Sequence, residues 1–541
     1  MRPFLTLHDP ATAQKYYAAG LWQQDTFYSL LQKHAGHMPS APAIRDSRLR
    51  LDWGSLLARV DALADSLADH GIGAGDRVSI WMSNRVEVIV AFLACSRLGA
   101  ACNPSLHRSY TCGEIIGLLQ DLQPAAVITE DGWGADRDLQ DFASMVAALP
   151  FVRKLYTPAD FHLHITGSAG IPHSNPDSVA YLAFTSGTTG KPKCVMHSSN
   201  TLLANARDLA RDWRLSSRDV ILTLSPLSHH IAWVAAGQWL VSGAEMVIDD
   251  PAPGQTKLDW ILETGATYVL GVPTHSMDIL AEQKARGLDR IGKVRVFYMA
   301  GAPIPEIVAR AFAEQGIMPQ NIYGMTENSS HQYTHPDDPL DTWVSTCGRG
   351  GRAYEVRIWD PENPDHELPQ GRTGEIGGKG AALMLGYYGN QDATLRSFNR
   401  HGYMMSGDLG ALDENGNLRI LGRFKDLIIR GGHNIFPSRI EALSLTHPRL
   451  SKVAAFPVPD DRLGEKVCLA VIGSVSAEEI LDHLAKEGLS KFDMPEWFIA
   501  METLPLTPSG KILKRELTEM VKRGEIAPQP VRYASKVKAK V

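Results

Sequence analysis

The amino-acid sequence predicts an α/β protein whose large N-terminal domain stacks mixed and parallel sheets with helices. Three observations support this fold class: strand-length apolar runs alternate with amphipathic helical patterns, short glycine-rich β runs begin near residue 348, and an α+β pattern follows residue 425. A chain of 541 residues is also too long for one ordinary core. We expect residues 1–424 to form the N-terminal domain, which includes a small β-rich subdomain, and residues 425–541 to form a small C-terminal domain.

The alternation of helices and strands begins near residue 55. Apolar residues recur at helical spacing from Leu56 to Leu67, and Gly71 favours an end to that helix. Ser198 or Ser199 can cap a later helix. Further buried strands are expected at residues 78–82, 99–102, 125–129, 181–185, 219–223, 245–248, 266–270 and 294–298. Several of these strands run into small or polar residues, and the ligands of open α/β sheets collect at such strand ends.

The composition excludes several classes of protein. The chain is 44% hydrophobic and 21% charged, as in ordinary globular enzymes, and its net charge of −6 at pH 7 argues against a nucleic-acid partner. The six cysteines include no C-x-x-C pair, which favours free thiols over disulfides or a zinc site. No apolar run approaches the roughly 20 residues that span a bilayer, and the first residues lack the apolar core of a secretory signal. We expect a cytoplasmic enzyme without a membrane span.

The loop Thr185–Lys193 has the composition of a phosphate-binding turn. It reads Thr-Ser-Gly-Thr-Thr-Gly-Lys-Pro-Lys after an apolar strand, so glycine amides, hydroxyl groups and two lysines can surround an anion. The spacing is not that of a Walker loop, because only two residues separate the glycines and a proline follows the first lysine. A flexible hydrophilic hairpin is the alternative interpretation.

Further motifs follow this loop in a fixed order. They are Asn321-Ile-Tyr-Gly-Met-Thr-Glu327, Tyr403-Met-Met-Ser-Gly-Asp408, the segment from Gly422-Arg-Phe-Lys-Asp426 to Glu441, and Leu504-Pro-Leu-Thr-Pro-Ser-Gly-Lys511. Together they resemble the motifs of the adenylate-forming superfamily, which includes acyl-CoA synthetases, adenylation domains and firefly luciferase. The resemblance covers nearly the whole chain. It is closest in appearance to medium-chain or cyclic and aryl carboxylate–CoA ligases.

The resemblance implies an ATP-dependent acid–thiol ligase that works in two half-reactions. A carboxylate attacks the α-phosphate of ATP to give an acyl-adenylate and pyrophosphate, and the thiol of CoA then displaces AMP. ATP, Mg²⁺ and CoA are the implied cofactors. Because the first step brings two anions together, charge neutralisation must supply most of the catalysis.

The resemblance places the catalytic groups at Lys511, Thr326 and Glu327. Lys511 would bridge the incoming carboxylate and the α-phosphate, and Thr326 would reach the α-phosphate. Glu327 would bind Mg²⁺ as a hard oxygen donor. The alternatives are a solvated lysine and a Thr-Glu pair that simply opens a helix.

The implied nucleotide site combines the loop with the later motifs. Tyr323 would stack on adenine, Asp408 would accept hydrogen bonds from the ribose hydroxyls, and Arg423 would contact ribose or phosphate. An exposed Ser-Gly-Asp turn and a surface arginine are the alternatives. The full implied set is Thr185, Ser186, Gly187, Thr188, Thr189, Gly190, Lys193, Gly301, Ala302, Asn321, Tyr323, Gly324, Thr326, Asp408 and Arg423.

The implied acyl pocket is largely apolar, which favours an alkyl, alicyclic or aromatic acid. Its lining residues would be His229, His230, Trp233, Val272, Thr274, Ala302 and Gly324. Residues 227–233 contain no acidic side chain, so an amino-acid substrate is disfavoured. His229 is interpreted either as a gate at the mouth of the acyl tunnel or as a satisfied core histidine.

The second half-reaction assigns roles to three further positions. The resemblance makes Lys425 the hinge about which a mobile C-terminal domain rotates, and it places Gly431 and Gly432 along the tunnel for the pantetheine arm. A β-hairpin turn also explains the two glycines. Cys194 stands where the family usually has glycine, so we expect ordinary backbone geometry there.

Two rival functions remain at this point. In the first, the chain loads the phosphopantetheine arm of a carrier protein instead of free CoA. In the second, it is a non-catalytic ligand-binding member, which the joint presence of Lys511, Glu327, Asp408 and Arg423 argues against. No separate motif in the sequence indicates a luciferase-like oxygenase. The sequence is also compatible with a homodimer.

Overall fold

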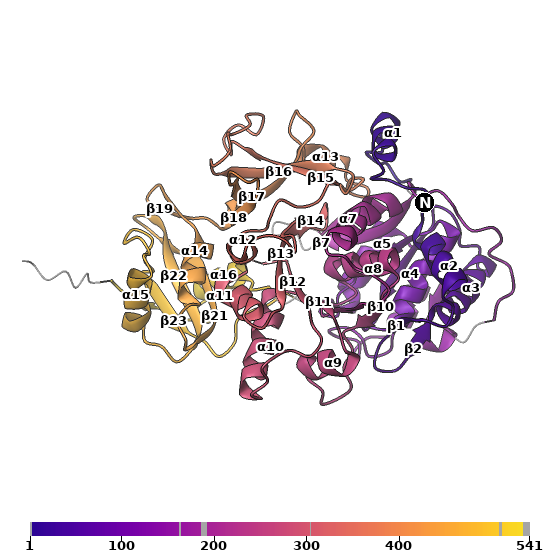
Figure 1. The fold of residues 1–541 in the computed structure, drawn as a ribbon, viewed down its shortest axis with the longest axis horizontal. Helices are drawn as coiled ribbons and strands as arrows, with labels where there is room; N and C mark the ends of the chain where they lie inside the picture. Colours follow the sequence, from indigo (N-terminus) through magenta and orange to yellow (C-terminus); the bar gives the residue numbers. More distant parts are fainter. Residues whose placement is uncertain (1–2, 162–163, 186–191, 303, 508–510, 534–541) are drawn as a thin grey trace, which may run out of the picture.

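The computed structural model describes residues 3–161, 164–185, 192–302, 304–507 and 511–533. Figure 1 shows a large N-terminal part, a small sheet above its junction with the C-terminal part, and the C-terminal domain at one end of the molecule. The expected α/β class, with a large N-terminal and a small C-terminal domain, is confirmed. Among these described residues, no helix combines the length and apolar character needed to cross a membrane.

Two large sheets form the frame of the N-terminal domain. The first has the order β14 (Ser329–Tyr333), β13 (Met318–Met325), β12 (Val296–Met299), β11 (Tyr268–Gly271), β9 (Val220–Thr223), β10 (Glu245–Ile248), β1 (Pro42–Arg45) and β2 (Arg50–Asp52). The second has the order β6 (Lys154–Tyr156), β5 (Ala126–Thr129), β3 (Arg77–Trp81), β4 (Ala101–Asn103), β7 (Val179–Thr185) and β8 (Lys193–Ser198). Most neighbouring strands are parallel, and the antiparallel pairs β1–β2, β13–β14 and β7–β8 lie at sheet edges. The sheets are therefore mixed, as predicted.

Helices cover both faces of the two large sheets. A central layer packs between the sheets and contains α2 (Phe27–His37), α3 (Trp53–Asp69), α4 (Val86–Leu98), α7 (Ser199–Asp212) and α8 (His230–Ser242). Outside the second sheet lie α5 (Cys112–Leu122) and α6 (Phe142–Ala147). Outside the first sheet lie α9 (Lys257–Thr264), α10 (Pro273–Ala285), α11 (Glu306–Ala313) and α12 (Leu340–Ser345).

Strand periodicity explains this layering. In β11 the side chains of Tyr268 and Leu270 join the central layer, whereas Val269 between them joins the outer layer. Successive side chains of a strand point to opposite faces, so a sheet covered on both sides needs apolar residues at every position. The continuous apolar runs of the sequence are the signature of such doubly covered strands.

The expected helix starts are confirmed in one case and shifted in another. Ser198 caps α7, with its hydroxyl accepting a hydrogen bond from the amide of Thr201. The helix expected from residue 55 begins at Trp53 instead, because the carboxylate of Asp52 accepts a hydrogen bond from the amide of Ser55 and so caps α3 two residues earlier.

The remaining elements form the small subdomain, the C-terminal domain and peripheral segments. The subdomain sheet has the order β15 (Tyr354–Trp359), β16 (Gly374–Gly380), β17 (Met404–Leu412) and β18 (Leu418–Arg423). The C-terminal sheet has the order β20 (His433–Ile435), β19 (Ile428–Arg430), β22 (Gly464–Gly473), β23 (Trp497–Ala500) and β24 (Gln529–Pro530), with β21 (Leu450–Asp460) paired to β22. It carries α14 (Pro437–Ser444), α15 (Ala477–Lys486) and α16 (Lys514–Lys522). Outside these units lie α1 (Pro10–Ala18), the 3₁₀ turn Pro158–Phe161 and α13 (Gln391–Arg396).

The tight turn between β13 and β14 depends on Gly324. A Cβ atom at this position would lie only 1.7 Å from the carbonyl oxygen of Ser329. Ser329 itself has φ of +57°, a left-handed conformation that is uncommon for a residue with a side chain. The close approach of the two strands therefore explains why residue 324 is glycine. This explanation differs from the open acyl pocket that the sequence suggested.

Replacing Gly324 with alanine is expected to lower the free energy of unfolding by about 1–3 kcal/mol, because the new methyl group overlaps backbone that must move. Thermal unfolding should show a lower apparent Tm. Gly113→Ala is a matched control, since a Cβ on this residue of α5 would meet no atom within 4 Å, and it should unfold at the wild-type temperature or above. An unchanged Tm for Gly324→Ala would contradict the requirement for glycine.

Candidate active site

The sequence motifs converge where the two domains meet. Lys511 follows β23 in the C-terminal domain, yet its side chain lies against the backbone of Gly301, which follows β12. A Cβ atom on Gly301 would lie 3.1 Å from Cε of Lys511. The glycine thus leaves room for the lysine, and its φ of +89° is one that glycine adopts freely.

Lys511 is a nearly desolvated cation. Its backbone is fixed by reciprocal hydrogen bonds with Thr507, one from the Thr507 amide to the Lys511 carbonyl at 2.7 Å and one from the Lys511 amide to Oγ1 of Thr507 at 3.0 Å. Burial, together with the charge of Arg423, lowers the pKa of Lys511 to about 8, and Asp408 and Glu327 partly oppose this shift. Its ammonium is therefore within electrostatic reach of both carboxylates.

Asp408 is held between two elements of the site. Oδ2 accepts a hydrogen bond from the hydroxyl of Tyr323 at 2.8 Å, and Oδ1 accepts one from Nε of Arg423 at 3.1 Å. Burial raises the pKa of Asp408, and Arg423 and Tyr323 counteract that rise. Three predicted nucleotide-binding side chains, from β13, β17 and β18, are therefore in direct contact.

The Thr326–Glu327 turn is supported from two sides. The hydroxyl of Tyr387 donates a hydrogen bond to Oε1 of Glu327 at 2.9 Å, and Nζ of Lys193 lies 4.5 Å from the centre of the Tyr387 ring. Burial raises the pKa of Glu327, whereas Tyr387 and Lys193 lower it. The backbone amide of Met384 donates to the Glu327 carbonyl at 2.7 Å.

Glu327 fits the requirements of a Mg²⁺ ligand. Its carboxylate is partly buried, so the bare anion carries an electrostatic cost that a divalent cation would offset. Within the described part of the chain, no cluster of three or more His, Cys, Asp or Glu side chains could hold a metal ion. A single carboxylate is compatible with Mg²⁺, which commonly takes its other ligands from water and substrate phosphates.

Asn321 offers an unused hydrogen-bond acceptor. The residue is 3% exposed, and its Oδ1 has no hydrogen-bond partner among the described residues. A buried polar atom without a partner is costly, so such an atom commonly awaits a water molecule or a ligand. This observation suits the predicted role in nucleotide binding.

Part of the predicted phosphate loop lies outside the described residues. This applies to Ser186, Gly187, Thr188, Thr189 and Gly190. The flanking residues Thr185 and Lys193 are paired across β7 and β8, so both loop ends are anchored in regular antiparallel structure. Cys194 continues β8 opposite Phe184, which confirms the expectation of ordinary backbone there.

The residues predicted to line the acyl pocket fall into two groups. His229 caps α8 beside Lys511, and burial together with Lys511 lowers its pKa to about 3, so the imidazole is neutral. Val272, Thr274 and Ala302 also follow strand ends of the first sheet. His230 and Trp233, by contrast, belong to the central layer, where Trp233 packs 4.4 Å from Phe92, ring centre to ring centre.

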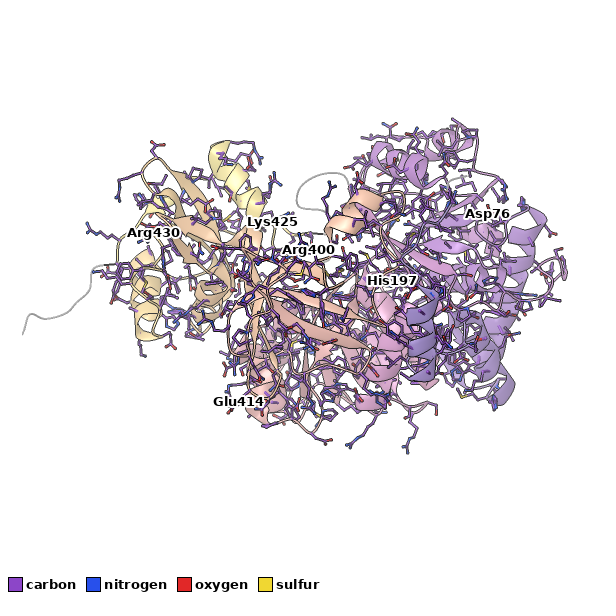
Figure 2. The ribbon with its side chains drawn as sticks, turned by 90° about the horizontal axis from the view of Figure 1, so that it is seen from above. Asp76, His197, Arg400, Glu414, Lys425 and Arg430 are labelled. Atoms are coloured by element: carbon purple, nitrogen blue, oxygen red, sulfur yellow. The ribbon has the colours of Figure 1, made fainter. Side chains whose placement is uncertain are left out.

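The predicted hinge and tunnel residues lie in the C-terminal part. Lys425 is in the 3₁₀ turn Phe424–Asp426, which joins the last strand of the subdomain to the first strand of the C-terminal sheet. Gly431 and Gly432 form the β19–β20 hairpin turn with φ values of +58° and +85°. In Figure 2, Arg430 beside this turn lies farther from His197 than Lys425 does. Both glycines are exposed in this arrangement.

Sequence reasoning missed Tyr387 and His197. Tyr387 touches the candidate metal ligand from more than fifty residues away in sequence, and His197 donates to the carbonyl of Thr326 through Nε2 at 2.7 Å. Each had a weak signal: a tyrosine pair bounded by glycines, and a single polar ring in the apolar run of β8. Neither pattern specifies a partner, because the contacts are non-local.

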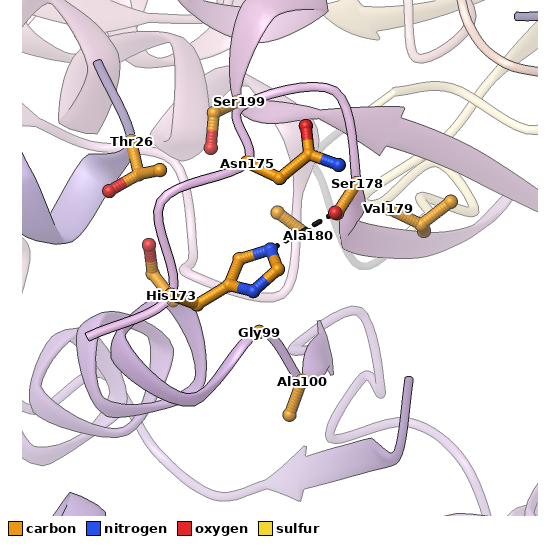
Figure 3. A pocket seen from close by; sticks show the side chains of 10 residues that line it. Thr26, Gly99, Ala100, His173, Asn175, Ser178, Val179, Ala180 and Ser199 are labelled. Atoms are coloured by element: carbon orange, nitrogen blue, oxygen red, sulfur yellow. Dashed lines mark hydrogen bonds between the residues drawn. The ribbon is translucent and has the colours of Figure 1, made fainter. Parts of the chain in front are cut away.

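A small polar cavity elsewhere is not part of this site. It has a volume of about 10 Å³, room for a single water molecule. Figure 3 shows it between the end of α4 and the start of β7, with His173 bonded to Ser178 at 3.0 Å. None of the predicted site residues lines it.

Comparison with known proteins decides the family. The AMP-binding enzyme family matches residues 31–388, and the AMP-binding enzyme C-terminal domain matches residues 439–511. The chain belongs to the AMP-binding enzymes. This adenylate-forming family accounts for the order of the motifs along the chain.

Several relatives of this AMP-binding enzyme are CoA ligases by name. The medium-chain fatty-acid–CoA ligase of Escherichia coli is 29% identical, with 97% of this chain and 95% of the relative covered. A salicylyl-CoA synthase / salicylate adenylyltransferase of Streptomyces is 30% identical over 94% of this chain and 96% of the relative. The ATP-bound MatB structure from Rhodopseudomonas palustris superposes with a TM-score of 0.80 at 29% identity, covering 92% of this chain and 99% of that one.

Replacing Tyr387 with phenylalanine should move the acid limb of ATP–pyrophosphate exchange to higher pH. The Tyr387 hydroxyl stabilises ionised Glu327, so its removal raises the Glu327 pKa further, and the carboxylate is protonated sooner as pH falls. Exchange rates measured across the acid range test this shift.

Tyr388→Phe is the matched control for this experiment. The ring of Tyr388 packs edge-on against Phe4, not against Glu327, so its pH profile should coincide with that of the wild type. Coinciding profiles for Tyr387→Phe and wild type would show that Glu327 does not titrate in the exchange reaction.

Proposed function

We propose that this AMP-binding enzyme is an ATP-dependent carboxylate–CoA ligase that forms an acyl-adenylate and then an acyl-CoA thioester. The observation that carries the proposal is the position of Lys511, whose side chain packs against Gly301 and whose ammonium is within electrostatic reach of Asp408 and Glu327. The C-terminal domain brings this cation to a site that also holds Asp408, the proposed ribose ligand, and Glu327, the proposed Mg²⁺ ligand. Such a site suits a reaction that joins two anions, a carboxylate and a phosphate. The names of the relatives support the same reaction class.

In the proposed first step, a carboxylate oxygen of the substrate attacks the α-phosphorus of ATP. A new P–O bond forms, the bond to the β-phosphate bridging oxygen breaks, and pyrophosphate leaves with the electron pair. The Lys511 ammonium would neutralise charge shared by the carboxylate and the α-phosphate, an effect that is strong in a desolvated site. Mg²⁺, when bound at Glu327, supplies further neutralisation of the phosphates.

The nucleotide would be held by side chains that are already in contact. We propose that Asp408 accepts hydrogen bonds from the ribose hydroxyls, that Tyr323 packs on adenine, and that Oδ1 of Asn321 accepts from the adenine amino group. Thr326 would contact the α-phosphate. The loop from Thr185 to Lys193 would cover the leaving pyrophosphate. Its two ends, Thr185 and Lys193, are paired across β7 and β8, so the loop is anchored at both sides.

In the proposed second step, the CoA sulfur attacks the acyl carbon and AMP leaves. The division of the chain at residues 424 and 425, with Lys425 as the hinge, would let the C-terminal domain withdraw Lys511 and present Gly431 and Gly432 instead. Domain closures of this kind use a few element-terminal residues as hinges. The exposure of both glycines in the present arrangement supports an alternation between two faces of the domain.

We propose a medium-chain, alicyclic or aromatic carboxylic acid as the substrate. The support is the apolar part of the candidate acyl site, with Val272 and Ile231 both 3.6 Å from a Cβ position on Gly301, and the medium-chain and salicylyl relatives.

ATP–pyrophosphate exchange across aliphatic, alicyclic and aromatic acids should identify at least one substrate that drives exchange. Adding CoA with that acid should produce AMP and a thioester in equal amounts. Exchange without a thioester would contradict CoA as the acceptor and favour a carrier-protein arm.

Replacing Lys511 with alanine should reduce exchange by about 10²–10³-fold, as expected for loss of a charge-stabilising group, and leave thioester formation from supplied acyl-adenylate intact. In the wild type, kcat/KM for exchange should fall as pH rises through about 8, where free Lys511 loses its proton. Lys491→Ala, which removes an exposed lysine of the same domain, should change neither reaction. Normal exchange by Lys511→Ala would refute the assignment.

A further inference from the structure

Two buried imidazoles from different elements lie face to face behind the candidate active site. His197 comes from β8 and His230 from the first turn of α8, and they are 0% and 7% exposed. Their ring centres are 5.7 Å apart, and their planes are inclined by 24°. His197 is labelled in Figure 2 within the N-terminal domain.

Each imidazole bonds to one end of the turn that carries Thr326 and Glu327. Nε2 of His197 lies 2.7 Å from the carbonyl oxygen of Thr326. Nε2 of His230 lies 3.1 Å from the hydroxyl of Ser329. The two histidines therefore bond to Thr326 and Ser329, the residues immediately before and after Glu327–Asn328.

The hydrogen-bond partners fix the tautomer of His197. A carbonyl oxygen can only accept, so Nε2 of His197 carries the proton. Nδ1 is then an acceptor, and it receives the hydroxyl of Thr201 at 3.0 Å. Burial lowers the pKa of His197 to about 4, with the bond to Thr326 opposing the shift, so the ring stays neutral near pH 7.

The turn needs such external support because its own backbone is strained. Ser329 is held at φ +57°, and its carbonyl oxygen occupies the space beside Gly324 that a side chain would need. Left-handed conformations of non-glycine residues persist only when the surroundings impose them. Without the imidazole contacts, the backbone carbonyl of Thr326 and the side chain of Ser329 would each lose a bond that holds them. The contacts of Glu327 with Tyr387 and Met384 and of Asn328 with Met325 would remain to resist a shift of the turn.

We propose that His197 is a positioning residue for adenylation, which acts by holding the Thr326 carbonyl and so the Thr326–Glu327 turn in its productive place. This inference rests on the proposed function of the turn. The imidazole itself takes no chemical step, because it is fully buried. We expect the first half-reaction to depend on a hydrogen-bond donor at the position of Nε2.

Three substitutions at residue 197 separate positioning from packing. Glutamine can place an amide N–H near the former Nε2, asparagine is polar but too short to do so, and leucine fills the space without a donor. We expect His197→Leu and His197→Asn to reduce ATP–pyrophosphate exchange and to raise the Mg²⁺ concentration for half-maximal exchange by about 10–100-fold, the usual effect of losing support behind a metal ligand. His197→Gln should recover most of both quantities.

Thioester formation from supplied acyl-adenylate and CoA should be unchanged in all three variants, because it uses neither pyrophosphate nor the metal. His173→Leu, which removes a histidine at the separate cavity of Figure 3, is the control and should leave both half-reactions and the Mg²⁺ requirement unchanged.

Equal loss of both half-reactions, or equal activity of the glutamine and asparagine variants, would overturn the positioning role. If the leucine variant does not fold, the comparison of glutamine with asparagine still decides the question. A wild type that catalyses no exchange with any acid would refute the proposed function, whereas an active wild type with unaffected variants would refute this inference alone.

Discussion

The burial of one ammonium group between two domains governs the arrangement of the whole site. Lys511 pays a desolvation cost that shows in its lowered pKa, and the nearby carboxylates Asp408 and Glu327 offset part of it. Those carboxylates are themselves buried enough for their pKa values to rise. The carboxylates are compensated mainly by Arg423, Tyr323, Tyr387 and Lys193 of the N-terminal domain, whereas the burial of Lys511 depends on the docking of the C-terminal domain.

The rest of the fold supplies rigid surroundings for these charges. The central helical layer is apolar on both sides, and its α8 is buried along most of its length, from His230 to Leu240. Close packing of this kind is hard to compress. The strand ends that carry Gly301, Tyr323 and the Thr326–Glu327 turn therefore keep a fixed spacing, whereas Lys511 belongs to a domain with its own hydrophobic core.

Local chemistry explains why much of this could be predicted from the sequence. Ser198 caps its helix by a hydrogen bond to the amide of Thr201, only three residues away. The continuous apolar runs indicate strands that are covered on both faces. The family resemblance indicated Asp408, Arg423 and Tyr323, which the structure brings together.

What escaped prediction depends on contacts between distant segments. The bonds from Tyr387 to Glu327 and from His197 to Thr326 join residues separated by 60 and 129 positions. The same limit applies to Gly324, whose neighbour is the carbonyl of Ser329, and to Trp233, whose ring fills the central layer. Composition and periodicity describe an element's faces but not which partner meets each face.

The distribution of the cysteines has a consequence for an enzyme that handles a thiol. Five of the six are buried and Cys347 is partly so, and all are free. Burial raises the pKa of Cys194 and Cys468, which keeps these sulfurs protonated and poorly nucleophilic. Burial also raises the pKa of the partly exposed Cys347 to about 12, so a CoA disulfide in the site would meet few protein thiolates able to attack it and form a mixed disulfide.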